Sequence, residues 1–277
     1  MITTEEFKAE IAEYASSSYE DFRRYQRLTS ETLAEVDRVA RIAGVDYQLA
    51  WGSLLGAVRD GGQIPWDYDI DLFVPIDQRQ LLVDGLRRHL DGRYYVSSIE
   101  FDEECDNYLM RVCPKGYDSS YMHVDIFFLC GAPCSRRKSF DRSFYILCRT
   151  RYWKYADVEK RARGNNLKRA CFNLFHALSS CVPNSALDRR YWSLANRVPL
   201  STAQEIVEAD RFSRDYTFPR SILDTEDIVL GDGSVRRVPK ERDELLRRMY
   251  GEYMLYAPTE SRFREFLSHY WALKSSL

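Results

Sequence analysis

The chain has 277 residues, 45% of them hydrophobic and 30% charged, which is enough to bury the core of one large domain or two modest ones. Its formal net charge of -2 argues against a general nucleic-acid binder, because that class is usually clearly basic. No apolar run approaches the roughly 18 residues of a membrane span, the acidic N-terminus lacks a signal peptide's apolar stretch, and seven cysteines without a CxxC pair favour reduced thiols, so we expect a cytoplasmic protein.

Residues 1–44 are predicted to form an N-terminal helical segment. We expect one helix over 4–28 and a second over 30–43, where apolar residues recur at three- and four-residue spacing. Ser30 suits the N-cap of the second helix, and Gly44 suits the left-handed position just after its end.

Residues 45–132 alternate apolar runs with helical patterns and polar turns, which indicates a mixed β-sheet flanked by helices, an α+β core. The expected strands are 45–51, 69–74, 94–101, 108–113 and 122–129, and the expected helices are 53–59 and 78–90.

Residues 133–277 are predicted to be mainly helical and packed on this core. The expected helices lie within 140–182, near 188–197, near 201–210, from Pro239 to about Gly251, and over 260–274. A β-hairpin is expected near 228–238, because the Gly231-Asp232-Gly233 turn lies between two apolar runs.

The most informative residues are Asp69 and Asp71, which lie in the strand-like run DIDLFV. In a strand this spacing places both carboxylates on one face, roughly 6.5–7 Å apart along the backbone. Burying two unpaired charges beside each other costs several kcal/mol, so the pair indicates a positive partner. A divalent cation that holds a phosphate is the commonest such partner.

Two further elements fit the same chemistry. Gly52 and Ser53 follow a strand and open a helix, where backbone N–H groups and the helix dipole favour a phosphate. Asp125 lies in the middle of another apolar strand and can supply a third metal ligand if that strand is a neighbour.

Each element also has a purely structural interpretation. Gly-Ser before a helix is often only an N-cap, and Asp125 can be a core acid paired with Arg111 or Lys115. A zinc site of Cys130, Cys134 and His123 is disfavoured, because the ligand spacing is poor.

The order strand, Gly-Ser, helix, Asp-x-Asp and a later acid resembles the nucleotidyltransferase superfamily pattern. More closely, WGSLLGAVRDGGQIPWDYDID over 51–71 resembles the signature of the LicD family, although Tyr68 replaces the usual middle acid and Asp60 the usual histidine. The C-terminal run LGDGSVRRVPKERDELLRRMYGEYMLYAP over 230–258 is similar to a second family pattern, and Arg262 matches an arginine that often follows it.

The resemblance implies an enzyme that transfers a phospho-alcohol, typically phosphocholine and in related members ribitol phosphate, from a CDP-linked alcohol donor. The acceptor would be a glycan or a lipid-linked saccharide precursor. Asp69, Asp71 and Asp125 would be catalytic and would bind Mg²⁺, with Mn²⁺ as the alternative, and Asp125 would be ligand or base. The resemblance also implies a set of substrate-binding residues, which comprises Gly52, Ser53, Arg59, Trp66 and Asp67.

Two rival functions remain open. One is a nucleotidyltransferase that moves NMP from an NTP to a small molecule or a protein, and the other is a non-catalytic nucleotide-binding module.

Residues 136–169 form a basic block with twelve Lys/Arg against three Asp/Glu. It is interpreted either as a solvated helical face or as a peripheral contact with the inner face of a membrane that carries the acceptor.

Overall fold

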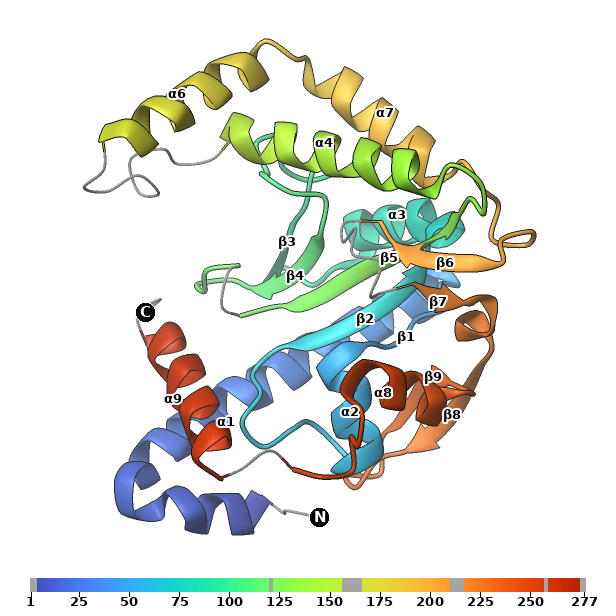
Figure 1. Cartoon of the computed structure of the whole chain (residues 1–277). Helices are drawn as coiled ribbons and strands as arrows, with labels where there is room; N and C mark the ends of the chain where they lie inside the picture. Colours follow the sequence, from blue (N-terminus) through green and yellow to red (C-terminus); the bar gives the residue numbers. More distant parts are fainter. Residues whose placement is uncertain (1–3, 120–121, 156–165, 210–216, 257–258, 275–277) are drawn as a thin grey trace.

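The computed structural model describes residues 4–119, 122–155, 166–209, 217–256 and 259–274. It shows the expected α+β fold, a mixed sheet flanked by helices (Figure 1). The sheet has seven strands in the order β1-β2-β5-β4-β3, with β6 paired to β5 and β7 paired to β6. Their bounds are β1 (Gln48–Leu49), β2 (Ile70–Pro75), β3 (Tyr94–Ser97), β4 (Met110–Pro114), β5 (Val124–Ala132), β6 (Glu205–Glu208) and β7 (Phe218–Pro219).

The five strands expected within 45–132 are all present, with their ends shifted by a few residues. β2 and β5 are parallel, whereas β4 runs antiparallel to β5 and to β3. In each strand, successive side chains point to opposite faces of the sheet. One face is apolar near the strand starts, because Ile70, Val112 and Val124 are buried there, while the other carries the predicted acids.

Helix α1 (Thr4–Ala43) covers the apolar face and packs against α3 (Arg79–His89). The expectation of two helices divided at Ser30 is wrong, since the helix continues through this position. The hydroxyls of Thr29 and Thr32 donate to the carbonyls four residues earlier, so neither residue caps a new helix. The end at Gly44 is confirmed by its φ of 68°.

Three helices lie at the other end of the molecule, namely α4 (Arg137–Tyr155), α6 (Asn166–Ser180) and α7 (Asn184–Ala195), at the top of Figure 1. They confirm the helical prediction for the described parts of 140–182 and for 188–197. Residues 156–165 lie outside the described residues.

The helix expected near 201–210 is wrong, because residues 205–208 form strand β6 and pair with the far end of β5. β6 and β7 thus bring the region after 132 into the sheet, although the division into three regions stays a prediction.

The predicted hairpin is confirmed as β8 (Thr225–Val229) and β9 (Val235–Pro239), and Gly233 takes the left-handed conformation that its turn requires. Pro239 does not open a helix. It pairs with Thr225 as the last residue of β9, and α8 (Arg242–Tyr250) begins three residues later. Short 3₁₀ turns, η1 (Ile76–Gln78) and η3 (Arg220–Leu223), follow β2 and β7.

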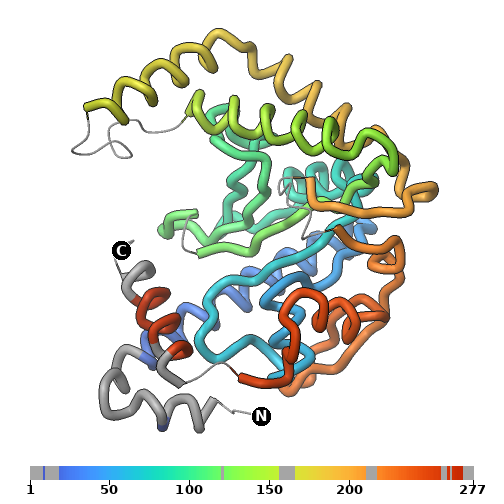
Figure 2. The backbone as a smooth tube through the Cα atoms, in the orientation of Figure 1, coloured from blue at the N-terminus to red at the C-terminus, as the bar shows by residue number. Residues whose placement is uncertain are grey.

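The last helix, α9 (Thr259–Lys274), returns to α1 (Figure 2). There Phe266 packs against Tyr19 and Phe22. Within the described residues, no helix combines the length and the apolar character that crossing a membrane requires.

Candidate active site

The acids predicted from the sequence meet on the polar face of the sheet. β2 and β5 are neighbours, and Asp71 and Asp125 are direct register partners in them. Arg111 of β4 is the register partner of Asp125 on its other side. Register partners point to the same face, so two neighbouring acids and then one arginine lie side by side across three adjacent strands.

The turn from β1 into helix α2 (Trp51–Arg59) is fastened to the backbone of Asp71. The Ala50 N–H donates to the Asp71 carbonyl at 2.9 Å, and the Asp71 N–H donates to the hydroxyl oxygen of Ser53 at 2.9 Å. Ser53 therefore joins the start of α2 to the acid-bearing strand. Its predicted role as a phosphate ligand stays a prediction.

Trp51 turns the chain sharply from strand to helix. Its φ of 42° is a left-handed conformation that non-glycine residues rarely adopt. The side chain is held from three sides, since its indole N–H donates to the buried Glu208 and its ring contacts Phe73 and Phe218. This packing fixes the direction in which α2 leaves the sheet.

The Asp67 carboxylate lies against the start of α2. A Cβ atom added to Gly52 would lie 2.8 Å from the Asp67 Oδ2 atom, so only glycine leaves room for this carboxylate. Burial, and next the charge of Asp69, raise the pKa of Asp67 well above its usual range. Two carboxylates held this close repel each other when both are ionised, and a cation would relieve that repulsion.

Asp125 is paired with Arg111, which is one of the two partners that the purely structural interpretation expected. The Arg111 Nε atom donates to Asp125 Oδ1 at 2.9 Å. The Nε2 atom of His123 lies 3.4 Å from the same oxygen and 4.0 Å from Asp69 Oδ2, so this buried imidazole stands between the two acids. Burial lowers the pKa of His123, although the neighbouring Asp125 opposes the shift.

The loop that precedes Asp69 is held by helices from both ends of the chain. From α1, the Gln26 side-chain amide donates to the Ile64 and Asp67 carbonyls at 3.0 and 2.5 Å, and the Thr29 hydroxyl donates to the Tyr68 carbonyl at 3.0 Å.

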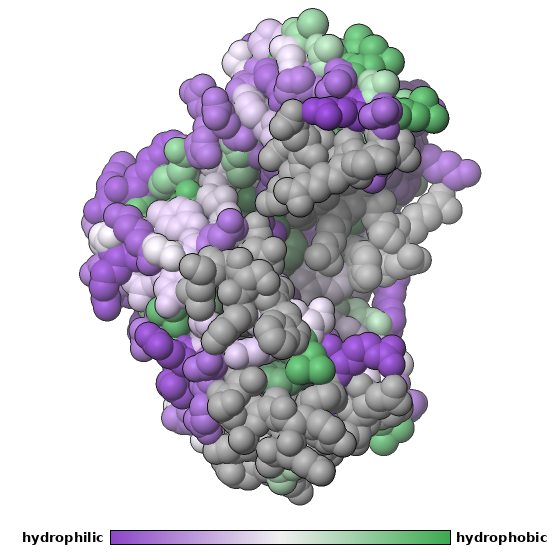
Figure 3. Space-filling model, turned by 90° about the vertical axis from the view of Figure 1, so that its left-hand side faces the viewer, coloured by the Kyte–Doolittle hydropathy of each residue, from purple (hydrophilic) through white to green (hydrophobic). Residues whose placement is uncertain are grey.

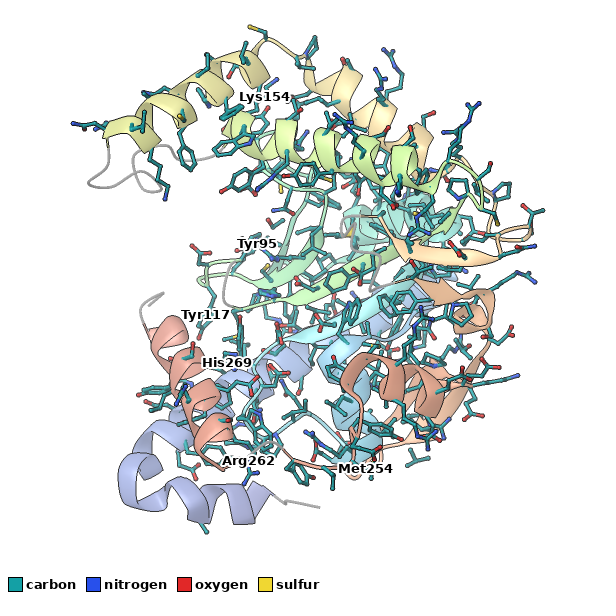
Figure 4. The ribbon with its side chains drawn as sticks, viewed as in Figure 1. Tyr95, Tyr117, Lys154, Met254, Arg262 and His269 are labelled. Carbon is teal, nitrogen blue, oxygen red and sulfur yellow. The ribbon has the colours of Figure 1, made fainter. Side chains whose placement is uncertain are left out.

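From α9, His269 Nδ1 lies 2.9 Å from the Trp66 carbonyl oxygen, and its ring packs edge-on against Tyr68. Figure 4 shows His269 and Arg262 on the side of α9 that faces this loop.

Arg59 and Trp66 are turned into the protein. Arg59 is 5% exposed, forms an ion pair with Asp60 at 3.0 Å, and lies 4.4 Å from the centre of the Tyr256 ring. Tyr256 in turn donates to Asp60 at 2.5 Å and contacts the edge of Trp66. The Arg262 guanidinium lies 5.6 Å from the centre of the Trp66 ring and 5.8 Å from that of Tyr256. Asp60 and Arg262 therefore belong to one buried cluster with Arg59. Direct substrate contact by Arg59 or Trp66 stays a prediction.

The donor set suits a hard divalent cation, because Asp71 and Asp125 share one face of the sheet and the neighbouring carboxylates of Asp67 and Asp69 lie in the loop that leads into β2. In the orientations that these side chains adopt, no three His, Cys, Asp or Glu residues of the described chain gather closely enough to hold a metal ion. Cation binding thus requires the carboxylates to rotate towards one another.

The disfavoured zinc interpretation finds no support among the same described residues. Cys130 is buried in β5, and Cys134 is exposed beyond its end.

Two histidines at the site were not identified from the sequence as site residues. For His123 a signal existed, since it precedes Asp125 by two positions and so shares its face of the strand. For His269 the local pattern does not indicate the contact, because its partner Trp66 is brought near only by the return of α9.

Part of the chain is similar to known proteins. Residues 44–165 match the family LicD/FKTN/FKRP, nucleotidyltransferase domain. Over 104 residues the chain is 36% identical to ribitol 5-phosphate transferase FKRP of Homo sapiens and 51% identical to that of Mus musculus, each match covering 36% of this chain and 20% of the relative.

Over 56 residues, which are 20% of this chain and 21% of the relative, the chain is 48% identical to lipopolysaccharide cholinephosphotransferase LicD of Haemophilus influenzae. Each match thus spans about a fifth of the relative's own length. Residues 44–165 of this chain are therefore similar to the LicD/FKTN/FKRP nucleotidyltransferase domain.

Proposed function

We propose that this protein transfers a phospho-alcohol from a CDP-linked alcohol donor to a hydroxyl of a glycan or of its lipid-linked precursor. Phosphocholine is the first candidate for the transferred group and ribitol phosphate the second, in line with the names of the two similar transferases. The observation that carries the proposal is the register of Asp71 with Asp125 beside the start of α2.

Each site residue has a proposed role that follows from its position. Asp69 and Asp71 would hold Mg²⁺, or Mn²⁺, together with the donor diphosphate, and the ion would neutralise the negative charge on the CMP leaving group. Gly52 and Ser53 lie at the N-terminus of α2, where backbone N–H groups favour phosphate oxygens.

Asp125 would serve as a further ligand or as the base that removes the proton of the acceptor hydroxyl. Arg111 and His123 both contact Oδ1 of Asp125, so Oδ2 would be the oxygen that takes this proton.

Donor identity can be tested by thermal shift with CDP-choline, CDP-ribitol, CDP-glycerol, CTP and ATP, each with Mg²⁺ and with a chelator. We expect one CDP-alcohol to raise the melting temperature only with the metal, because a bound ligand stabilises the folded state. Stabilisation by the triphosphates alone would favour the nucleotidyltransferase alternative. Metal-dependent binding without turnover of any CDP-alcohol would favour the non-catalytic module.

Asp71→Asn tests the metal assignment. Transfer should fall by at least about 100-fold, because a charge that organises the transition state is removed, while the fold should persist, since backbone atoms of Asp71 make the contacts to Ala50 and Ser53. Asp77→Asn, at an exposed acid just after β2, is the matched control and should retain full activity. Near wild-type transfer by Asp71→Asn would show that the metal assignment is wrong.

A further inference from the structure

In its described part, the basic block at 136–169 does not form one solvated face. The buried Arg151 donates to the Cys105 and Glu103 carbonyls at 2.7 Å, Arg137 forms ion pairs with Asp141 and Glu205, and Lys154 donates to the Val182 carbonyl. These three basic residues serve the fold, which leaves Lys138, Arg142 and Arg149 exposed on the described part of α4.

The exposed side of the helices is instead apolar in large part. Ile146 of α4 is 51% exposed, and Leu174 and Leu178, one turn apart on α6, are 58% and 60% exposed. Ser179 is the one residue of α6 that is buried, so most of this helix surface is accessible to solvent. Hydrophobic atoms accordingly lie beside hydrophilic ones at the top of Figure 3, at the height of these helices in Figure 1. Contiguous exposed apolar side chains usually mark an interaction site.

Two adjoining grooves lie along the outward side of α4. One, of about 690 Å³, runs between α4 and α7, and the other, of about 510 Å³, runs between α4 and α6. Ile146, Thr150 and Val182 line both grooves, so the two form one continuous surface. Ile146 and Thr150 point away from the side of α4 that buries Phe140, Phe144 and Arg151, because helical spacing places them on a different side.

The charged side chains that line these grooves are all positive. Arg149 lines the groove towards α6, and Arg189 and Arg190 line the groove towards α7, while no Asp or Glu is among the described lining residues. Helix α6 also contains no Asp or Glu in its 15 residues and carries Lys168 and Arg169 in its first turn. Tyr145 and Trp153, on either side of Arg149, are residues that favour the water–lipid boundary.

We propose that this α4–α6–α7 surface, made by Ile146, Leu174 and Leu178 with Arg149, Arg189 and Arg190, docks onto an anionic lipid bilayer. The apolar side chains would enter the headgroup boundary, and the arginines would contact lipid phosphates. The inference goes beyond the proposed reaction and does not depend on it, because its readout is binding to lipid.

A second copy of the chain is a poorer occupant for the same surface. In a two-fold contact the surface would face itself, so Arg149, Arg189 and Arg190 would meet the same arginines without an acid between them, and like charges oppose association. An anionic bilayer supplies both an apolar layer and the opposite charge.

The test is flotation of the whole chain with phosphatidylcholine vesicles and with vesicles that also contain phosphatidylglycerol. We expect binding to the anionic vesicles only, with a decrease at high salt. The double variant Leu174→Ser/Leu178→Ser should lose at least about tenfold in partition coefficient, because two apolar side chains no longer leave water. Arg189→Glu/Arg190→Glu should lose about 30-fold, at about 1 kcal/mol for each basic residue near the surface.

Matched controls lie at the opposite end of the molecule. Val229 and Leu255 are as exposed as the two leucines, and Arg247 and Arg248 are exposed on α8. Val229→Ser/Leu255→Ser and Arg247→Glu/Arg248→Glu should therefore bind vesicles as the wild type does. The proposal is overturned if the wild type does not float with anionic vesicles, if the controls lose as much binding as the α6 and α7 variants, or if the surface drives self-association without lipid binding.

Discussion

At Gly52, the space that a side chain would need is occupied by the Asp67 carboxylate. Glycine is therefore required here by lack of space. Conformational freedom is not the cause, since the φ of Gly52 is not left-handed. It also explains why the start of α2 and the loop before Asp69 act as one unit. The same carboxylate accepts a hydrogen bond from the Tyr68 N–H at 3.0 Å, which holds it in place.

Gly52→Ala should lower the free energy of unfolding by about 1–3 kcal/mol, because overpacking a buried contact forces neighbouring groups apart. Gly92→Ala, where an added Cβ meets nothing within 4 Å, is the control and should stay within about 0.5 kcal/mol of the wild type. Urea denaturation measures both values.

The same clash can be checked by a double-mutant cycle. Asp67→Ala removes the oxygen that the new methyl group would meet, so in its background Gly52→Ala should cost less. Equal costs in both backgrounds would show that the Asp67 carboxylate is not the obstacle.

At the scale of elements, the sequence predicted the helices and the hairpin whose formation depends on residues close together in the chain. The hairpin at β8–β9 was found because glycine-rich turns have their own sequence signature, and α3 and α9 were found from their ends and spacing. Strand β6 was missed because its four residues are a strand only through pairing with β5, which is remote in sequence. The continuity of α1 through Ser30 was missed because Thr29 and Thr32 are satisfied within the helix.

In the candidate site, too, some positions could be predicted from local sequence and others could not. The shared face of Asp69 and Asp71 follows from strand periodicity, and the neighbouring position of Asp125 could be stated as a condition that the sheet order then fulfilled. The contact of Arg59 with Tyr256 could not be predicted, since it depends on where the chain after α8 returns.

Arg151 joins α4 to the segment before β4. Its side chain is fully buried, and besides the two carbonyls it binds Asp188 of α7 at 2.8 Å. Arg151→Met should lower the free energy of unfolding by about 3–5 kcal/mol, because one acid and two carbonyls lose their charged donor. Chemical denaturation followed by circular dichroism measures the loss.

The control for this change is Arg142→Met, at an exposed arginine on the same helix, which should change stability by at most about 0.5 kcal/mol. Similar small losses for both variants would show that the Arg151 contacts contribute little to stability.

At the scale of the whole molecule, the two ends of the chain close around the candidate site. Helix α1 lies under the sheet and bonds the loop at residues 64–68, and α9 lies on α1 and bonds the same loop through His269. The loop that leads into Asp69 is therefore positioned by residues from both helices. Loss of the packing between them should reach the acids even though neither helix carries one of the three predicted catalytic residues.

Phe266→Ala tests this coupling. The ring is fully buried and contacts Tyr19 and Phe22 at centre-to-centre distances of 5.9 and 5.1 Å, so its removal should lower the free energy of unfolding by about 3–5 kcal/mol. Amide hydrogen exchange should also rise in residues 64–68, because α9 then holds His269 less firmly against Trp66. Leu255→Ala, at an exposed position before α9, should change neither quantity. Faster exchange confined to α9, with residues 64–68 as protected as in the wild type, would mean that α1 alone positions the loop.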